Sequence, residues 1–108
     1  MNTQIRVQKM LSYIYEHYSE NISLADIASA ANISRSEAGR CISMCLQKTP
    51  VDFLIHYRLQ KAHCLLGDTT LTLQEIIQSC GFHSVNYFIR QFRLHYGYTP
   101  GALRGLGK

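Results

Sequence analysis

The feature that most constrains the fold of this chain is an internal repeat of about fifty residues. The segment Ser23–Ile33 (SLADIASAANI) matches the segment Thr72–Phe82 (TLQEIIQSCGF) at an offset of 49. After that segment the offset becomes 50, so that Arg40 aligns with Arg90. Each half has the pattern of a short helix, a tight turn and a longer helix. The repeat therefore predicts two copies of one supersecondary unit in a single chain.

The turn inside each copy has a matching chemistry. Asn32 and Gly81 occupy equivalent positions, and these two residue types tolerate a left-handed backbone best. Ile33 and Phe82 follow them and are expected to fill the angle between the two helices. This arrangement is that of a helix-turn-helix, whose second helix can enter the major groove of DNA. Two such matches in register are far more specific than one.

Helix-start signals recur along the chain. Three pairs place a hydroxyl residue three positions before an acid, which predicts capping boxes at Ser23/Asp26, Ser34/Glu37 and Thr72/Glu75. Two Thr-Pro pairs, Thr49-Pro50 and Thr99-Pro100, predict a Thr cap with Pro at the first helical position.

These signals predict an all-α fold of seven helices, because no sustained alternation of apolar and polar residues indicates a strand. We expect helices near residues 4–18, 24–31, 35–47, 50–66, 73–80, 85–95 and a short one from 100. Residues 1–108 are expected to form one domain with two helix-turn-helix subdomains. The first subdomain covers about 5–48, the linking helix about 50–66 and the second subdomain about 72–104.

Composition favours a globular cytoplasmic protein. Of the 108 residues, 46% are hydrophobic and 17% are charged, a balance typical of a packed domain. The apolar runs are far shorter than the roughly 20 residues of a membrane span, and no secretory signal is visible at the N-terminus. We therefore expect neither membrane association nor export.

The four cysteines lie in stretches that are otherwise apolar and helical, namely Cys41, Cys45, Cys64 and Cys80. We expect them to be reduced thiols in the core. Disulfides and a metal site at Cys41 and Cys45, which share a helix face, are the alternatives. Because neither a CxxC pair nor a downstream HxxxH completes a ligand set, we expect no metal and no cofactor.

The formal net charge is +4, and its distribution is uneven. No acidic residue follows Glu75, whereas Arg90, Arg93, Arg104 and Lys108 all do. A basic C-terminal third is typical of a surface that binds a polyanion. An ordinary solvated basic face is the alternative interpretation of the charge distribution.

The second half resembles the C-terminal DNA-binding domain of the AraC/XylS family of bacterial transcription regulators. Residues 81–100, GFHSVNYFIRQFRLHYGYTP, are similar to the family signature GFxSxxYFxRxFxxxxGxTP. The first half adds further matches, among them Ser23-Leu24, Ile33-Ser34 and Thr49-Pro50, so that the resemblance covers about residues 5–104.

The resemblance implies the sequence-specific DNA-binding domain of a longer regulator. It implies two recognition helices in successive major-groove segments of double-stranded DNA, and contact with RNA polymerase as a further possibility. An isolated domain is expected to be monomeric, because both reading helices lie in one chain. One departure from the family is Gly39, which presents no side chain to a base, so we expect the first unit to read sequence weakly or to contact mainly phosphate.

Helical spacing and the resemblance together predict the DNA-contacting residues. In the second recognition helix, Phe88 and Phe92 form the core stripe, which leaves Arg90 for the groove. Arginine can bind guanine, asparagine can bind adenine and an aliphatic side chain can pack on a thymine methyl group. The predicted set is Arg35, Ser36, Arg40, Val85, Asn86, Ile89, Arg90 and Arg93.

Two other classes of function remain as alternatives. A degenerate helix-turn-helix could act mainly as a protein-interaction module, and the Gly39 departure motivates that interpretation. An enzyme has little support, because the sequence has neither a phosphate-binding glycine loop nor a nucleophile motif. A methyl-accepting cysteine of a DNA-repair regulator is the nearest enzymatic interpretation, and the cysteines look buried. We therefore predict no catalytic residue.

Overall fold

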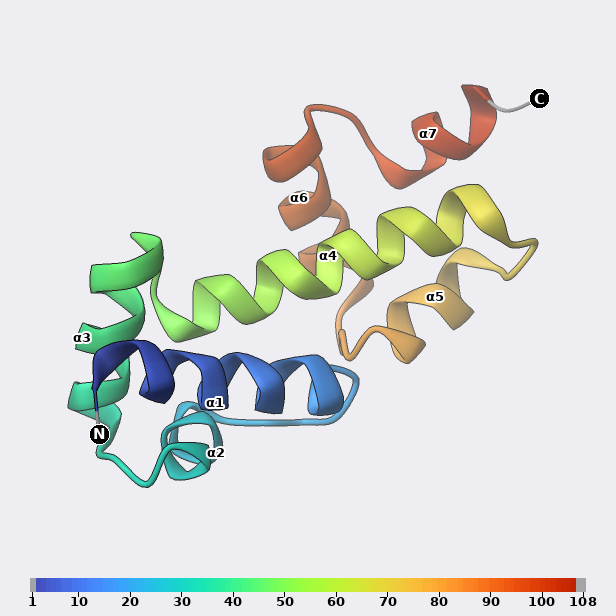
Figure 1. The fold of residues 1–108 in the computed structure, drawn as a ribbon. Coiled ribbons are helices and arrows are strands. Elements are labelled where there is room, and N and C mark those ends of the chain that lie inside the picture. Colours follow the sequence, from blue (N-terminus) through green and yellow to red (C-terminus); the bar gives the residue numbers. More distant parts are fainter. Residues whose placement is uncertain (1, 107–108) are drawn as a thin grey trace. The chain divides into compact units, whose positions relative to one another are not determined.

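The computed structural model describes residues 2–106, and within them the chain forms seven α-helices and no strand. The helices are α1 (Thr3–His17), α2 (Leu24–Ala30), α3 (Arg35–Leu46), α4 (Pro50–Asp68), α5 (Leu73–Ser79), α6 (Val85–Tyr96) and α7 (Pro100–Leu106) (Figure 1). This confirms the predicted all-α class, and each predicted helix boundary lies within three residues of the observed one. Lys108, which the sequence placed in the basic C-terminal third, lies outside the described residues.

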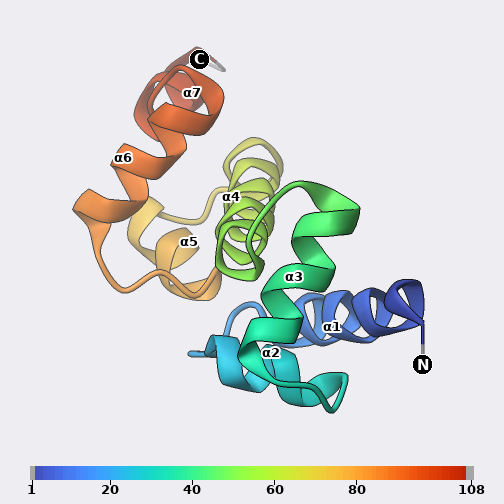
Figure 2. The same ribbon diagram turned by 90° about the vertical axis from the view of Figure 1, so that its left-hand side faces the viewer.

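The chain divides into two compact units, one ending at Ile55 and the other starting at His56. In the first unit α1, α2 and α3 all pack against one another, as two views of the ribbon show (Figures 1 and 2). Each helix contributes an apolar stripe to the buried centre, namely Val7, Met10 and Ile14 from α1, Ile27 and Ala28 from α2, and Ala38, Cys41 and Ile42 from α3.

The second unit is built around α6, which packs against α5 and α7. Phe88 and Phe92 of α6 are fully buried, which confirms the predicted core stripe, and their rings lie 5.6 Å apart between centroids. Phe82, from the turn before α6, meets Phe88 edge to face at 4.9 Å and so fills the angle between α5 and α6 as expected. Aromatic pairs in this geometry add to the stability that burial alone supplies.

Helix α4 begins in the first unit and ends in the second. Its start is the expected Thr-Pro signal, because the Thr49 hydroxyl accepts the N–H of Asp52 at 3.0 Å. Its apolar side buries Leu54, Leu59, Ala62 and Leu66. The same cap recurs before α7, where the Thr99 hydroxyl accepts the N–H of Ala102 at 3.1 Å.

The internal sequence repeat is accompanied by the same backbone hydrogen bonds in both turns. In the first turn the N–H of Ile33 donates to the carbonyl of Ala28, and in the second the N–H of Phe82 donates to that of Ile77, each at 3.1 Å. The residue before each donor has a left-handed backbone, with φ +56° at Asn32 and +88° at Gly81. The prediction made from these two residue types is confirmed.

A second pair of left-handed residues ends the helix that follows the turn in each copy of the repeat, α3 in the first unit and α6 in the second. Gln47 (φ +55°) ends α3 and Gly97 (φ +83°) ends α6, fifty residues apart. Their N–H groups donate to the carbonyls of Ser43 at 3.0 Å and Arg93 at 2.8 Å. A left-handed residue is costly for any side chain with a Cβ, so Gln47 is the less favourable of the two C-caps.

Two of the three predicted capping boxes are complete, at Ser23/Asp26 and Thr72/Glu75. At the start of α3 only half of the box is present, since the Ser34 hydroxyl accepts the N–H of Glu37 at 3.2 Å. The prediction of a reciprocal box is wrong there because the Glu37 carboxylate accepts from two arginines instead.

The prediction that all four cysteines are thiols in the core is only partly correct. All four are free thiols, but only Cys41 and Cys80 are buried, whereas Cys45 and Cys64 are exposed. Cys45 lies one helical turn after the buried Cys41, near the end of α3, yet it is exposed. Within residues 2–106, no helix combines the length and apolar composition needed to cross a bilayer.

Candidate nucleic-acid interface

Helix α6, the second helix of the helix-turn-helix in the second unit, has two chemically different sides. Its start is fixed by Ser84, whose hydroxyl accepts the N–H of Tyr87 at 3.1 Å. Burial of Phe88 and Phe92 then turns Asn86, Arg90 and Arg93 to the solvent, where all three are exposed. Val85 is 44% exposed and Ile89 is half-buried at the edge of this side. The structure therefore brings the five residues predicted from α6 together on one helix.

The exposed side of α6 borders a shallow pocket that the sequence reasoning did not predict. The pocket has a volume of about 540 Å³, and its lining residues are Asn86, Ile89, Arg90, Arg93, Leu94, Gly97 and Thr99. Leu94, the newly found member, is 74% exposed. Leu94 can contact the apolar parts of a ligand, while the two neighbouring guanidinium groups can contact its negatively charged parts.

The charge on this side of α6 is uniformly positive. Neither α6 nor α7 contains an acidic residue, while α6 carries two exposed arginines. Arg104 of α7 belongs to a different environment, because its guanidinium donates to the backbone carbonyls of Leu71 and Thr69. The basic C-terminal third is thus divided between two arginines on the recognition helix and one that ties α7 to the segment before α5.

Helix α3, the second helix of the helix-turn-helix in the first unit, repeats the arrangement with different side chains. Ala38, Cys41 and Ile42 are buried, and the predicted residues Arg35, Ser36 and Arg40 are all exposed. Met44, 66% exposed, is the counterpart of Leu94 fifty residues later. Gly39 lies between these groups, and a Cβ atom added there would meet nothing within 4 Å.

Glu37 of α3, predicted as a capping partner of Ser34, makes contacts with two arginines that the sequence reasoning missed. Its Oε2 accepts from Nη1 of Arg6 on α1 at 3.3 Å, and its Oε1 accepts from Nη2 of Arg40. The hydrogen bond from Arg40 lowers the pKa of the Glu37 carboxyl, with the charges of Arg40 and Arg6 adding to the effect. The i, i+3 spacing of Glu37 and Arg40 in the sequence could have predicted their contact. The contact with Arg6 could not be predicted in this way, because it depends on how α1 packs against α3.

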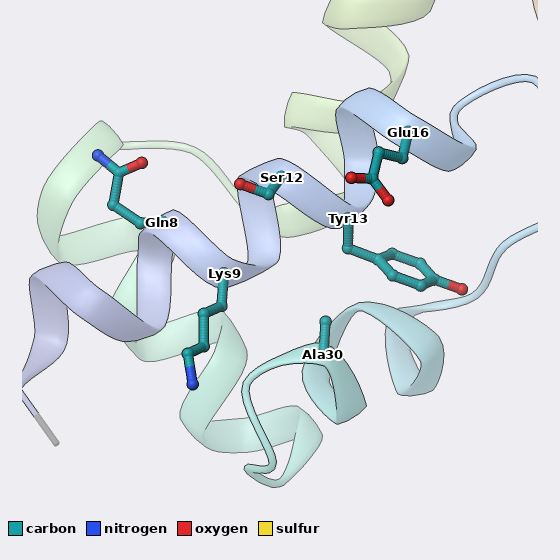
Figure 3. Close-up of a pocket in the computed structure, with 6 residues that line it drawn as sticks. All are labelled: Gln8, Lys9, Ser12, Tyr13, Glu16 and Ala30. Atoms are coloured by element: carbon teal, nitrogen blue, oxygen red, sulfur yellow. The ribbon is translucent and has the colours of Figure 1, made fainter.

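A pocket on the first unit is a less suitable candidate site. It is lined by Gln8, Lys9, Ser12, Tyr13 and Glu16 of α1 and by Ala30 of α2. Figure 3 shows that the side chains of Gln8, Lys9 and Tyr13 point in different directions rather than toward a common point. It contains none of the residues predicted to contact a ligand.

In each unit the second helix of the helix-turn-helix, α3 or α6, has an apolar buried side and an exposed side that carries arginine. Comparison with known proteins agrees with this architecture. A helix-turn-helix domain family matches residues 27–105. The chain belongs to the AraC-type helix-turn-helix family. This family membership confirms the resemblance found from the signature at residues 81–100.

Curated relatives carry names of regulatory proteins. The transcriptional regulator YdeC of Bacillus subtilis, of helix-turn-helix type, is 40% identical over 95 residues, which are 88% of this chain and 33% of YdeC. The xylose operon regulatory protein of Escherichia coli K12 is 34% identical over 103 residues, or 94% of this chain and 26% of that protein. The chain therefore spans a third or less of the length of these two relatives.

Solved structures agree with the fold over nearly the whole chain. An AraC-type DNA-binding domain protein from Chromobacterium violaceum aligns with a TM-score of 0.88 at 28% identity, covering 94% of this chain and 91% of that one. The DNA-binding domain of AdpA, solved in complex with a target DNA, aligns with a TM-score of 0.87 at 26% identity, covering 92% and 89%. The relatives are named as regulators rather than enzymes.

Proposed function

We propose that this chain binds double-stranded DNA in a sequence-specific manner and serves transcriptional regulation as the DNA-binding part of a longer bacterial regulator. The observation that carries the proposal is the exposed side of α6, which joins Asn86, Arg90 and Arg93 on a helix without any acidic residue. Membership of the AraC-type family and the likeness to a domain solved with its target DNA support it.

In this proposal α6 is the stronger reading helix. Arg90 would bind guanine through two hydrogen bonds, and Asn86 would bind adenine in the same groove. Val85 and Ile89 supply apolar surface for a thymine methyl group, and Arg93 adds a further positive charge. The pocket beside these residues leaves room for a base edge or a phosphate.

In the first unit, α3 offers Arg35, Ser36 and Arg40 to a second segment of major groove. Because one chain holds both reading helices, the isolated chain binds as a monomer to a site without internal symmetry. The soluble regulator acts in the cytoplasm, where its DNA is. Contact with RNA polymerase belongs to the same proposal and rests on the family resemblance alone.

The test is the affinity of the chain for DNA, measured by fluorescence anisotropy. A duplex is first selected from a randomised library with the wild-type protein, and its affinity is then measured at several salt concentrations. We expect a steep decrease in affinity with salt, because each neutralised phosphate adds about 0.9 to the logarithmic slope. Arg90→Ala should weaken binding to the selected duplex about 5- to 150-fold, the range for loss of one bidentate base contact.

A matched control removes one positive charge from a surface outside the two proposed reading helices. Lys9 is exposed on α1, outside both reading helices, and Lys9→Ala should change affinity for the selected duplex much less than Arg90→Ala does. If the wild-type protein selects no duplex and binds none at low salt, DNA binding by this chain is wrong. A role as a protein-interaction module would then be the hypothesis to test.

A further inference from the structure

In both units the exposed arginine at the centre of the second helix of the helix-turn-helix, α3 or α6, contacts the residue three positions before it. Arg40 of α3 is held by Glu37, and Arg90 of α6 is held by Tyr87. Glu37 and Tyr87 are fifty residues apart, as are the two arginines, so both pairs occupy equivalent places in the repeat. The two contacts differ in chemistry: Glu37 and Arg40 form an ion pair, whereas Tyr87 and Arg90 form a cation–π contact.

The contact in the second unit involves a half-buried ring. Tyr87 is half-buried, its N–H donates to the Ser84 hydroxyl at 3.1 Å, and its ring lies 6.4 Å from that of Phe82. The Arg90 guanidinium carbon lies 5.6 Å from the centroid of the Tyr87 ring. A guanidinium within about 6 Å of an aromatic face is attracted to it while its N–H groups stay free to donate.

The contact in the first unit rests on a fixed carboxylate. One oxygen of Glu37 binds Arg6 of α1, so that the carboxylate is held from outside α3, and the other oxygen binds Arg40. Side-chain exposure is 34% for Glu37 and 65% for Arg40, so the arginine still projects into solvent. This contact leaves the remaining N–H groups of Arg40 available, but it also places a negative charge beside them.

We propose that Tyr87 and Glu37 are positioning residues that hold Arg90 and Arg40 in the orientation needed to read DNA. The proposal rests on the proposed function, and it assigns a role to two residues that need not contact a base. An arginine side chain loses considerable rotamer freedom when it binds, and a contact already present in the free protein removes part of that loss. Holding the arginine also favours the one base that fits its fixed orientation over other bases.

The different chemistry of the two contacts has a distinguishable consequence. Tyr87 adds no charge, so its loss affects discrimination between bases without changing the general attraction to phosphate. Glu37 offsets part of the positive charge of Arg40, so its loss reduces discrimination while increasing affinity for any duplex. A merely structural role of either residue would lower specific and non-specific binding together.

The first experiment measures arginine order in the free protein by NMR. The proteins are wild type, Tyr87→Phe, Tyr87→Leu and a control, Tyr57→Leu, which removes a similar contact on α4, where Lys61 lies 5.3 Å from the Tyr57 ring. We expect the ring-current shift and the order of the Arg90 Nε–H group to be kept in Tyr87→Phe and Tyr57→Leu and lost in Tyr87→Leu. An unchanged Arg90 signal in Tyr87→Leu would overturn the proposal for the second unit.

The second experiment measures discrimination, as the ratio of the Kd for single base-pair variants to the Kd for the duplex that the wild type selects. Tyr87→Leu should lower this ratio roughly two- to tenfold at the base pairs that Arg90→Ala also affects, with non-specific Kd unchanged. Tyr87→Phe should match the wild type. Equal losses in Tyr87→Phe and Tyr87→Leu, or full discrimination in both, would show that the ring does not position Arg90.

Glu37→Gln tests the first unit without removing a buried side chain. We expect it to lower discrimination at the base pairs that Arg40→Ala affects and to bind a non-specific duplex more tightly than wild type. Weaker non-specific binding, or unchanged discrimination, would overturn the role of Glu37. Duplex selection by the wild-type protein distinguishes a failure of the proposed function from a failure of the positioning role. If the wild-type protein selects no duplex, DNA reading itself is refuted, whatever the variants do.

Discussion

The substitution Gly39→Ala should stabilise the protein, although it lies in the middle of a proposed DNA-reading helix. Gly39 is an interior residue of α3, and its backbone is helical. A Cβ atom at this position would meet nothing within 4 Å, so the added methyl group causes no clash. The expected effect is therefore the full difference in helix propensity between glycine and alanine, about 1 kcal/mol in favour of the folded state.

Urea unfolding followed by circular dichroism at 222 nm measures this change as a higher midpoint with an unchanged slope. In thermal unfolding the same gain corresponds to an increase in Tm of about 4 °C for a chain of this size. Gly97→Ala is the matched control, because a Cβ there also meets nothing within 4 Å while the backbone φ is +83°. It should lose about 1–2 kcal/mol, the cost of a left-handed residue with a side chain. A neutral or destabilised Gly39→Ala protein would refute the reasoning, since it would mean that α3 is not a regular helix at this residue.

Three further predictions follow from the caps and the core. Gln47→Gly should stabilise by about 0.5–1 kcal/mol in urea unfolding, because glycine removes the strain of φ +55°; a loss of stability would contradict the strain argument. Thr72→Ala should cost about 1 kcal/mol and Ser34→Ala less, since only Thr72 belongs to a complete capping box; equal costs would show that the reciprocal bond adds nothing. Burial raises the pKa of the Cys80 thiol from 9.0 to about 11. Below pH 9 the thiol is protonated in both states, and above it only the unfolded chain loses the proton, so stability should decrease by about 2 kcal/mol between pH 9 and 11. Cys80→Ala should show a smaller decrease over the same pH range, and an equal one would assign the effect to other groups.

Backbone features were predictable from the sequence because they depend on residue type at single positions. Asn32 and Gly81 tolerate the left-handed turn, and the Thr-Pro pairs begin α4 and α7. Each such signal acts within a few residues of the chain, so a repeat of signals predicts a repeat of helices.

Features that depend on contact between distant segments were not predictable in the same way. Cys45 is exposed although the buried Cys41 lies one turn before it on α3, so helical spacing alone did not predict its exposure. The partner of Glu37 is Arg6, 31 residues away, and it changes a predicted capping residue into a bridge between two arginines. The pocket beside α6 likewise combines that helix with Thr99 at the start of α7.

The two units show why a shared backbone does not imply equal surfaces. The positions that keep their character between the copies are those that the backbone or the core requires, such as the left-handed turn and the buried residues Ile42 and Phe92. The exposed positions are free of that requirement, and there the copies differ, with Glu37 in the place of Tyr87. An acid beside Arg40 reduces the attraction of α3 to any polyanion, whereas α6 keeps its full positive charge. If DNA is the ligand, α6 should therefore dominate the salt dependence of binding, and α3 should contribute to affinity only where its arginine meets a matching base.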